Sequence, residues 1–176
     1  MNISGTLTQV LVIEDSSQIG HARRTAQRLA EQHGFGESDA GRVALVATEL
    51  ASNVLKHAGR GELHLRLLPR QGDDGIEMIA VDRAQGFDLD ACLADGFSTG
   101  GTQGIGLGAV ARQADIFDVF ADHRGAVLLA RLYPRSDRQA DLPYGVSQHS
   151  LHNDPACGDV WHLAIHGRDI SALIVD

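Results

Sequence analysis

The chain has 176 residues, 43% of them hydrophobic and 22% charged, which suffices for one domain with a core, or for one domain and part of another. The formal net charge of −8 argues against a nucleic-acid partner, because neutralising phosphates requires clustered Lys and Arg. No signal peptide is evident, no apolar run approaches the roughly 20 residues of a membrane span, and the separated Cys92 and Cys157 favour reduced thiols. We therefore expect a cytoplasmic protein with no membrane partner.

Two helices are predicted in the first third of the chain, after a short β-rich run over residues 7–13. Ser16 or Ser17 is the expected N-cap of the first helix, and Gly34 ends it. Ser38 is the expected cap of the second helix, which runs to about His57 with an apolar stripe along one side.

The rest of this unit reads as strands around a third helix. Alternating and β-branched runs predict strands at residues 62–68, 75–82, 116–122 and 126–133, with a polar turn over 69–74. A short helix near 88–94 and a flexible loop precede a helix that opens at Gly104 and runs to about Ala114. This order predicts an α+β fold: a two-layer α/β sandwich in which a mixed or antiparallel sheet carries its helices on one face.

A polar, charged segment over residues 135–143 predicts a linker between two parts of the chain. The first part, residues 1–134, holds the predicted sandwich. The second, residues 144–176, is a β-rich fragment with strand-like runs at 144–146, 159–165 and 170–176.

Three motifs carry chemistry, and the first is on the second helix. Glu49 and Asn53 lie four residues apart and share one face with His57. The Asn53 carbonyl oxygen suits Mg²⁺, Glu49 can accept a proton from an incoming hydroxyl, and Lys56 can reach a phosphate oxygen as a point charge. Taken alone, such a pair is usually a solvated helix edge, and His57 and Lys56 have equally ordinary interpretations at a helix end.

The second and third motifs lie on either side of the predicted loop. Asp82 ends a strand, can accept a hydrogen bond from an exocyclic amine, and is followed by a turn at Gly86. The glycines at 104, 106 and 108 leave closely spaced backbone N–H groups open at a helix start, which suits a polyphosphate. Each motif alone fits a turn or a flexible loop, but the ordered set indicates a nucleotide site.

The three motifs together resemble the N, G1 and G2 boxes of the GHKL (Bergerat-fold) ATPases. The closer likeness is to the anti-sigma-factor and stressosome switch kinases of bacteria, and it covers about residues 7–133. It includes Gly34-Phe35-Gly36, Ala58-Gly59-x-Gly61 and Asp95-Gly96-Phe97-Ser98-Thr99. One departure is Ala84, which stands where the G1 box has its middle glycine and narrows the choice of turn if φ is positive there.

The resemblance implies an ATP-binding protein serine/threonine kinase that uses Mg²⁺ and phosphorylates a STAS-domain antagonist protein. It makes Glu49 the base, Asn53 the Mg²⁺ ligand and Asp82 the adenine contact. The remaining nucleotide contacts that it implies are Lys56, Gly86, Thr99, Gly104, Ile105, Gly106, Leu107 and Gly108. A sigma factor or a phosphatase is a further partner of that class, and a homodimer is compatible with it. The alternative is a non-catalytic, nucleotide-gated binding module, such as an anti-sigma factor or a phosphatase activator.

The last part of the chain resembles the start of SpoIIE-type phosphatases of the PPM class. The likeness rests on Cys157-Gly158-Asp159-Val160-Trp161 and on Leu173-Ile174-Val175-Asp176. It implies that Asp159 and Asp176 are ligands of Mn²⁺ or Mg²⁺, in a site whose other ligands are absent from these residues, so we expect no phosphatase activity. The alternative is that these strands only extend the first domain.

Overall fold

The computed structural model describes residues 2–4, 7–69, 74–84, 103–135, 146, 148, 157–166 and 169–175. The elements in chain order are β1 (Asn2–Ser4), β2 (Gln9–Ile13), α1 (Ser16–Gln32), α2 (Glu37–Ala58), β3 (Gly61–Leu68), β4 (Gly75–Asp82), α4 (Gln103–Gln113), β5 (Ile116–Asp122), β6 (Gly125–Leu132), β7 (Val160–His166) and β8 (Asp169–Val175). Among these described helices, none is long and apolar enough to cross a membrane.

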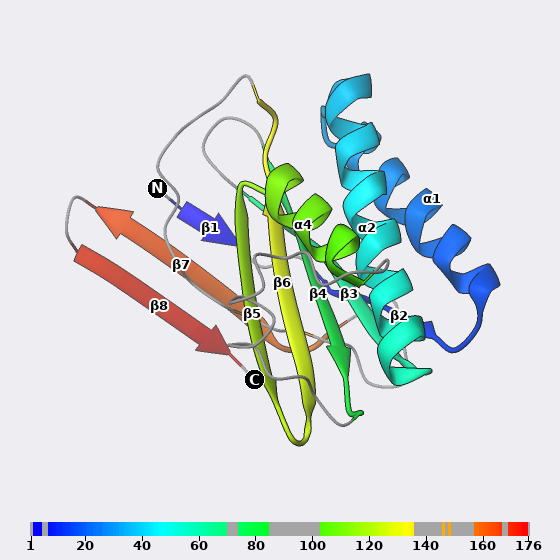
Figure 1. Ribbon diagram of the computed structural model, residues 1–176. Helices are drawn as coiled ribbons and strands as arrows, with labels where there is room; N and C mark the ends of the chain where they lie inside the picture. Colours follow the sequence, from blue (N-terminus) through cyan, green and yellow to red (C-terminus); the bar gives the residue numbers. More distant parts are fainter. Residues whose placement is uncertain are drawn as a thin grey trace.

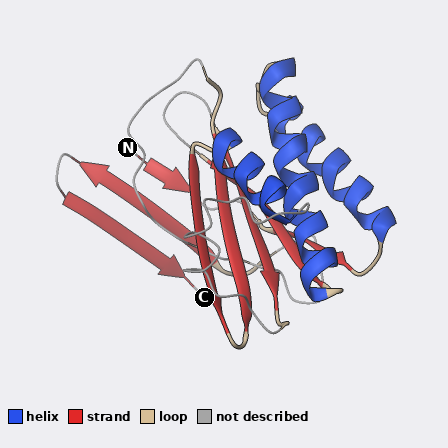
Figure 2. Ribbon diagram, in the orientation of Figure 1, coloured by secondary structure: helices blue, strands red, loops and turns tan. Residues whose placement is uncertain are grey.

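A five-stranded sheet with the order β2-β3-β4-β6-β5 forms one layer, and α1, α2 and α4 form the other (Figure 1). The helices lie side by side on one face of the sheet, with α2 between α1 and α4 (Figure 2). The predicted two-layer sandwich is confirmed. Each described strand pair is antiparallel, so of the two sheet types left open the antiparallel one is present.

The core fills the space between the helices and the inner face of the sheet. Alternate residues of β3 and β4, such as Leu63, Leu65 and Met78, point toward the helices and are at most 1% exposed. The stripe of α2 that sequence periodicity predicted includes Val43, Val46 and Leu50, all fully buried; this central helix has neighbours on both sides and the sheet below.

The two helix N-caps differ from the predicted residues. Asp15, and not Ser16 or Ser17, caps α1, with its carboxylate accepting the Ser17 N–H at 2.7 Å. The Ser17 hydroxyl and N–H also hold the pKa of Asp15 below its usual value, because both donate to the carboxylate. The cap of α2 is Gly36, which has no side chain to accept a backbone N–H, and Ser38 lies inside the helix. An N-cap residue has extended φ and ψ angles, and the residues that meet this condition lie one or two positions before the predicted ones.

The sheet face that points away from the helices carries a buried group of three charges. Arg66, Glu77 and Arg131 stand opposite one another on β3, β4 and β6, and their side chains are 3%, 1% and 4% exposed. The Glu77 carboxylate accepts one bond from the Arg66 Nε at 2.6 Å and one from the Arg131 Nε at 2.8 Å. Strand alternation alone would place these side chains in solvent.

The C-terminal strands form a separate three-stranded antiparallel sheet with the order β1-β7-β8. The predicted strands at 159–165 and 170–176 match β7 and β8, whereas β1 was not predicted and Val146 is not in a strand. Just before β2, the Thr8 N–H donates to the Gln148 carbonyl at 3.1 Å.

Several predictions lie outside the described residues. They are the helix near 88–94, the loop that follows it, most of the turn over 69–74 and residues 136–143 of the linker. The division of the chain into residues 1–134, 135–143 and 144–176 stays a prediction.

Candidate functional site

The α2 face that carries the first motif contains a buried amide nitrogen. Asn53 is 8% exposed, and its buried Nδ2 atom has no hydrogen-bond partner among the described residues. Glu49, one turn earlier, is half-buried and makes no hydrogen bond or ion pair within the described part of the chain. Leaving a buried amide unpaired costs free energy, so this position is suited to a ligand that supplies the missing contact.

Asp82 ends β4 with its carboxylate turned back toward the chain. Its Oδ1 accepts the Ala84 N–H at 3.1 Å, which closes a short Asx turn. Alanine in place of the middle glycine of this box therefore still allows the turn to form. The second carboxylate oxygen of Asp82 has no hydrogen-bond partner among the described residues and can accept one from a ligand.

Two glycines on the neighbouring strands, Gly61 and Gly125, enclose the Asp82 backbone; the sequence placed Gly61 in a stretch that resembles the family, and no role was predicted for Gly125. A Cβ at Gly61 would lie 2.5 Å from the Val81 carbonyl oxygen, 2.7 Å from Cγ1 of Val54 on α2 and 3.2 Å from the Asp82 Cβ. A Cβ at Gly125, whose φ is +147°, would lie 2.1 Å from the Asp82 carbonyl oxygen. Asp82 is thus fixed on both sides, and Gly61 sets its close approach to α2.

The third motif lies at the N-terminus of α4, as predicted. Gln103, Gly104, Ile105 and Gly106 form the first turn, which contains no acidic residue. The helix packs on α2 and on the sheet through Val110, which is fully buried, and Leu107. Its first backbone N–H groups lack intrahelical acceptors and point toward the positive end of the helix dipole, where an anion is stabilised.

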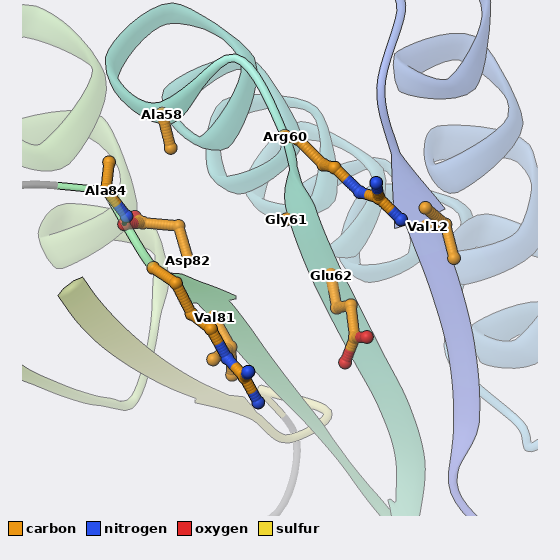
Figure 3. Close-up of a pocket in the computed structure, with 9 residues that line it drawn as sticks. Val12, Ala58, Arg60, Gly61, Glu62, Val81, Asp82 and Ala84 are labelled. Atoms are coloured by element: carbon orange, nitrogen blue, oxygen red, sulfur yellow. Dashed lines mark hydrogen bonds between the residues drawn. The ribbon is translucent and has the colours of Figure 1, made fainter. Parts of the chain in front are cut away.

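A pocket of about 500 Å³ opens beside Asp82 (Figure 3). It is lined by Val12, Ala58, Arg60, Gly61, Glu62, Val81, Asp82, Arg83 and Ala84. Asp82 is the predicted site residue in this lining, while Glu49 and Asn53 are not part of it. The pocket therefore shares Asp82 with the predicted nucleotide site and extends from there over Val12 of β2 and Glu62 of β3.

The structure brings the three motif-bearing elements together, because α2 contacts both β4 and α4, and α4 contacts β6. Lys56 and His57 are exposed in the last turn of α2, where a positive charge also suits the helix dipole. Gly86 and Thr99 lie outside the described residues. Residues 104–106 are placed by their backbone, in the first turn of α4.

Of the two metal ligands predicted in the C-terminal part, Asp159 is among the described residues. Asp159 is exposed and directly precedes β7, where Val160 pairs with Val175 near the end of β8. Asp176 lies outside the described residues. Within the residues that are described, no group of three or more His, Cys, Asp or Glu side chains is arranged to hold a metal ion.

Residues 13–132 match the family described as histidine kinase-like ATPase domain. The serine/threonine-protein kinase RsbT of Bacillus subtilis (strain 168) is 35% identical over 99 residues, which are 56% of this chain and 74% of RsbT. A histidine kinase domain from the blue-light activated histidine kinase of Erythrobacter litoralis EL346 is 21% identical, with a TM-score of 0.43. That similarity covers 68% of this chain and 60% of the solved chain, less than two thirds of its length.

The chain belongs to the family of histidine kinase-like ATPase domains. The matched residues begin in β2 and end in β6, so they include α2, Asp82 and α4. Predicted membership of the GHKL class is confirmed, and the family match does not extend to β7 and β8.

Replacing Gly61 with alanine should destabilise the domain and displace Asp82. We expect Gly61→Ala to lower the free energy of unfolding by about 1–3 kcal/mol, the usual cost of overpacking, because two of the contacts are with backbone or a buried side chain. The control is Gly41→Ala in α2, where a Cβ meets nothing within 4 Å and alanine should add about 0.5–1 kcal/mol. Denaturant unfolding of both variants checks this; equal stability would show that the β4 end is not tightly packed.

Proposed function

We propose that this chain is an ATP-dependent protein serine/threonine kinase of the switch type, with a STAS-domain antagonist protein as its substrate. The observation that carries the proposal is the position of Glu49 one turn before Asn53, whose buried Nδ2 atom has no partner among the described residues, on a helix that packs against α4. The 35% identity to a kinase that acts on serine or threonine supports it.

The residues present fit ATP with Mg²⁺. The Nδ2 atom of Asn53 can donate to a ligand, and its Oδ1 atom is the kind of oxygen that Mg²⁺ prefers as a ligand. Asp82 keeps one carboxylate oxygen for the amine of adenine, and the α4 N-terminus offers its N–H groups to phosphates. We assign Lys56, Gly86 and Thr99, together with the stretch from Gly104 to Gly108, to the remaining nucleotide contacts.

Glu49 supplies the acid–base part of the reaction in this proposal. ATP supplies the phosphoryl group, and Glu49 accepts or orients the proton of the attacking serine or threonine hydroxyl. The Glu49 carboxylate has no partner among the described residues and is available for that hydrogen bond. Asn53, one turn further along α2, holds the cation that neutralises the phosphates.

The C-terminal part is proposed as the start of a SpoIIE-type phosphatase domain. The support is the Cys157-Gly158-Asp159-Val160-Trp161 stretch, together with an antiparallel hairpin whose register brings the residues before β7 next to the end of β8. Asp159 and Asp176 are the two metal ligands in this proposal.

Binding of ATP with Mg²⁺ should stabilise the protein against heat. At an ATP concentration 100 times Kd, ligand binding adds about 2.7 kcal/mol to the free energy of unfolding, which corresponds to a rise in Tm of several degrees. Asn53→Ala should remove most of the part of this shift that depends on Mg²⁺. Thermal unfolding with ATP, with and without Mg²⁺, measures both effects, and a wild-type Tm that does not move with ATP·Mg²⁺ contradicts the nucleotide site.

Asp82→Asn should weaken adenine nucleotides by about tenfold to a hundredfold. The substitution turns a free acceptor oxygen into a group that can present N–H to the amine of the base, and a buried hydrogen bond to a charged group contributes about 1.5–3 kcal/mol. Inorganic triphosphate, which lacks the base, serves as the control ligand and should bind both proteins alike. Calorimetry with ATP and triphosphate tests the assignment, which fails if ATP binds the variant and the wild type equally.

A further inference from the structure

A cluster centred on the buried Arg42 side chain connects α2 to the C-terminal end of α4. The Arg42 side chain is 5% exposed, and its Nη1 atom donates to the Gln113 carbonyl at 3.0 Å and lies 3.3 Å from Asp115 Oδ2. Its Nη2 atom donates to the Tyr133 carbonyl and lies 3.2 Å from Asp39 Oδ1. One side chain therefore joins α2, the end of α4 and the end of β6.

The partners of Arg42 are further linked to one another. Asp115 Oδ2 also accepts the Tyr133 N–H at 2.8 Å, and the Asp115 N–H donates to the Arg131 carbonyl at 2.9 Å. Gln113 is the last residue of α4, so its carbonyl has no intrahelical donor, and the guanidinium satisfies it at the negative end of the helix dipole. The cluster holds the α4 C-terminus in one place relative to α2.

The same two helices also carry the candidate site, further along α2 and at the N-terminus of α4. Glu49 and Asn53 lie about two and three turns after Arg42 on α2, and the glycines of the third motif form the opposite end of α4. An 11-residue helix is about 16 Å long and behaves as a rigid rod, so a shift of its C-terminus also moves its N-terminal N–H groups. These N–H groups must lie within less than about 1 Å of the positions that the phosphate oxygens require.

We propose that Arg42 is a positioning residue for the phosphates of the bound nucleotide, which it influences by holding α4 against α2. The inference rests on the proposed function, in which the α4 N-terminus binds phosphates. Adenine recognition through Asp82 does not involve this cluster, because β4 contributes none of its members. Loss of Arg42 should therefore lower the affinity for nucleotides whose phosphates reach α4, and it should leave the contribution of the adenine base unchanged.

The test compares Arg42→Met with Arg66→Met in ATP and AMP binding. Arg66 is the matched control, because it is also a buried arginine in an ion network, and its partner Glu77 lies in β4, which contributes no member of the Arg42 cluster. Kd values come from NMR titration with each nucleotide and Mg²⁺, at a temperature where both variants are folded. We expect the ratio of the ATP Kd to the AMP Kd to rise at least tenfold in Arg42→Met and to stay within twofold of wild type in Arg66→Met.

Each outcome separates the two proposals. Wild type that binds neither nucleotide overturns the proposed function itself, whereas ATP binding with an unchanged ratio in Arg42→Met overturns the positioning role alone. An equal change of the ratio in Arg66→Met also overturns it, because the effect would then be general destabilisation. If Arg42→Met does not fold, Asp115→Asn replaces it; Asp115 is 41% exposed, and its variant should raise the same ratio by about two- to fivefold. An unchanged ratio in Asp115→Asn counts against the proposal.

Discussion

Glu49→Gln should reduce phosphotransfer by about 10²–10⁴-fold while ATP affinity stays within a few-fold of wild type. The substitution keeps the size of the side chain and removes its ability to accept the hydroxyl proton. Glu49 makes no hydrogen bond or ion pair with the described residues, so its replacement leaves no protein group unsatisfied. Single-turnover phosphotransfer to a STAS-domain protein from the same genome measures the effect.

Two controls separate a catalytic role from a structural one. Glu37→Gln changes an exposed glutamate in the first turn of the same helix and should leave the rate unchanged. A pull-down with the STAS-domain protein should show that Glu49→Gln still binds its partner. Unchanged transfer in Glu49→Gln would assign the base to another residue, and absence of transfer in wild type, with partner binding intact, would favour the non-catalytic binding module.

Glu77→Gln should lower the free energy of unfolding by about 3–5 kcal/mol, the cost of removing one partner from a buried ion network. The carboxylate is 1% exposed and binds Arg66 and Arg131 through separate oxygens, so the variant leaves two buried guanidinium groups without a counter-charge. In a protein of this size, that loss corresponds to a fall in Tm of roughly 6–20 °C.

The control for Glu77 is Glu62, which lies on the same face of the sheet in the neighbouring strand β3. Glu62→Gln removes a carboxylate that is 50% exposed and paired with His64 at 2.8 Å, and such surface pairs contribute about 0–1 kcal/mol. Denaturant unfolding of both variants makes the comparison. If the Glu77→Gln variant were as stable as the Glu62→Gln variant, water would have to reach the ion network around Glu77.

Local patterns in the sequence located the elements of the ATPase domain well. The apolar periods of α2 and β3 identify core residues such as Leu50 and Leu63, both fully buried, because a helix or strand that buries one face repeats its apolar residues at its own period. The glycines of the third motif also mark the start of α4 correctly. Cap residues were missed by one or two positions, since a cap depends on the dihedral angles of one residue.

The resemblance of the three motifs to the boxes of the family was sufficient to identify it. The motifs lie on a helix, at a strand end and at a glycine-rich helix start, in that order. The sequence did not show which atoms of these motifs lack a hydrogen-bond partner among the described residues. The unpartnered amide of Asn53 and the open oxygen of Asp82 depend on neighbours, and those neighbours come from other elements of the fold.

Three features were decided by the tertiary structure alone, because each joins residues that are far apart in the chain. Arg42 meets the Tyr133 carbonyl 91 residues away, and Glu77 meets Arg131 54 residues away, only because β6 is inserted beside β4. Gly61 is required where β3 passes between α2 and Asp82. A sequence pattern reports which residues share a face of one element, whereas burial of a charge or exclusion of a Cβ depends on what a distant segment places against that face.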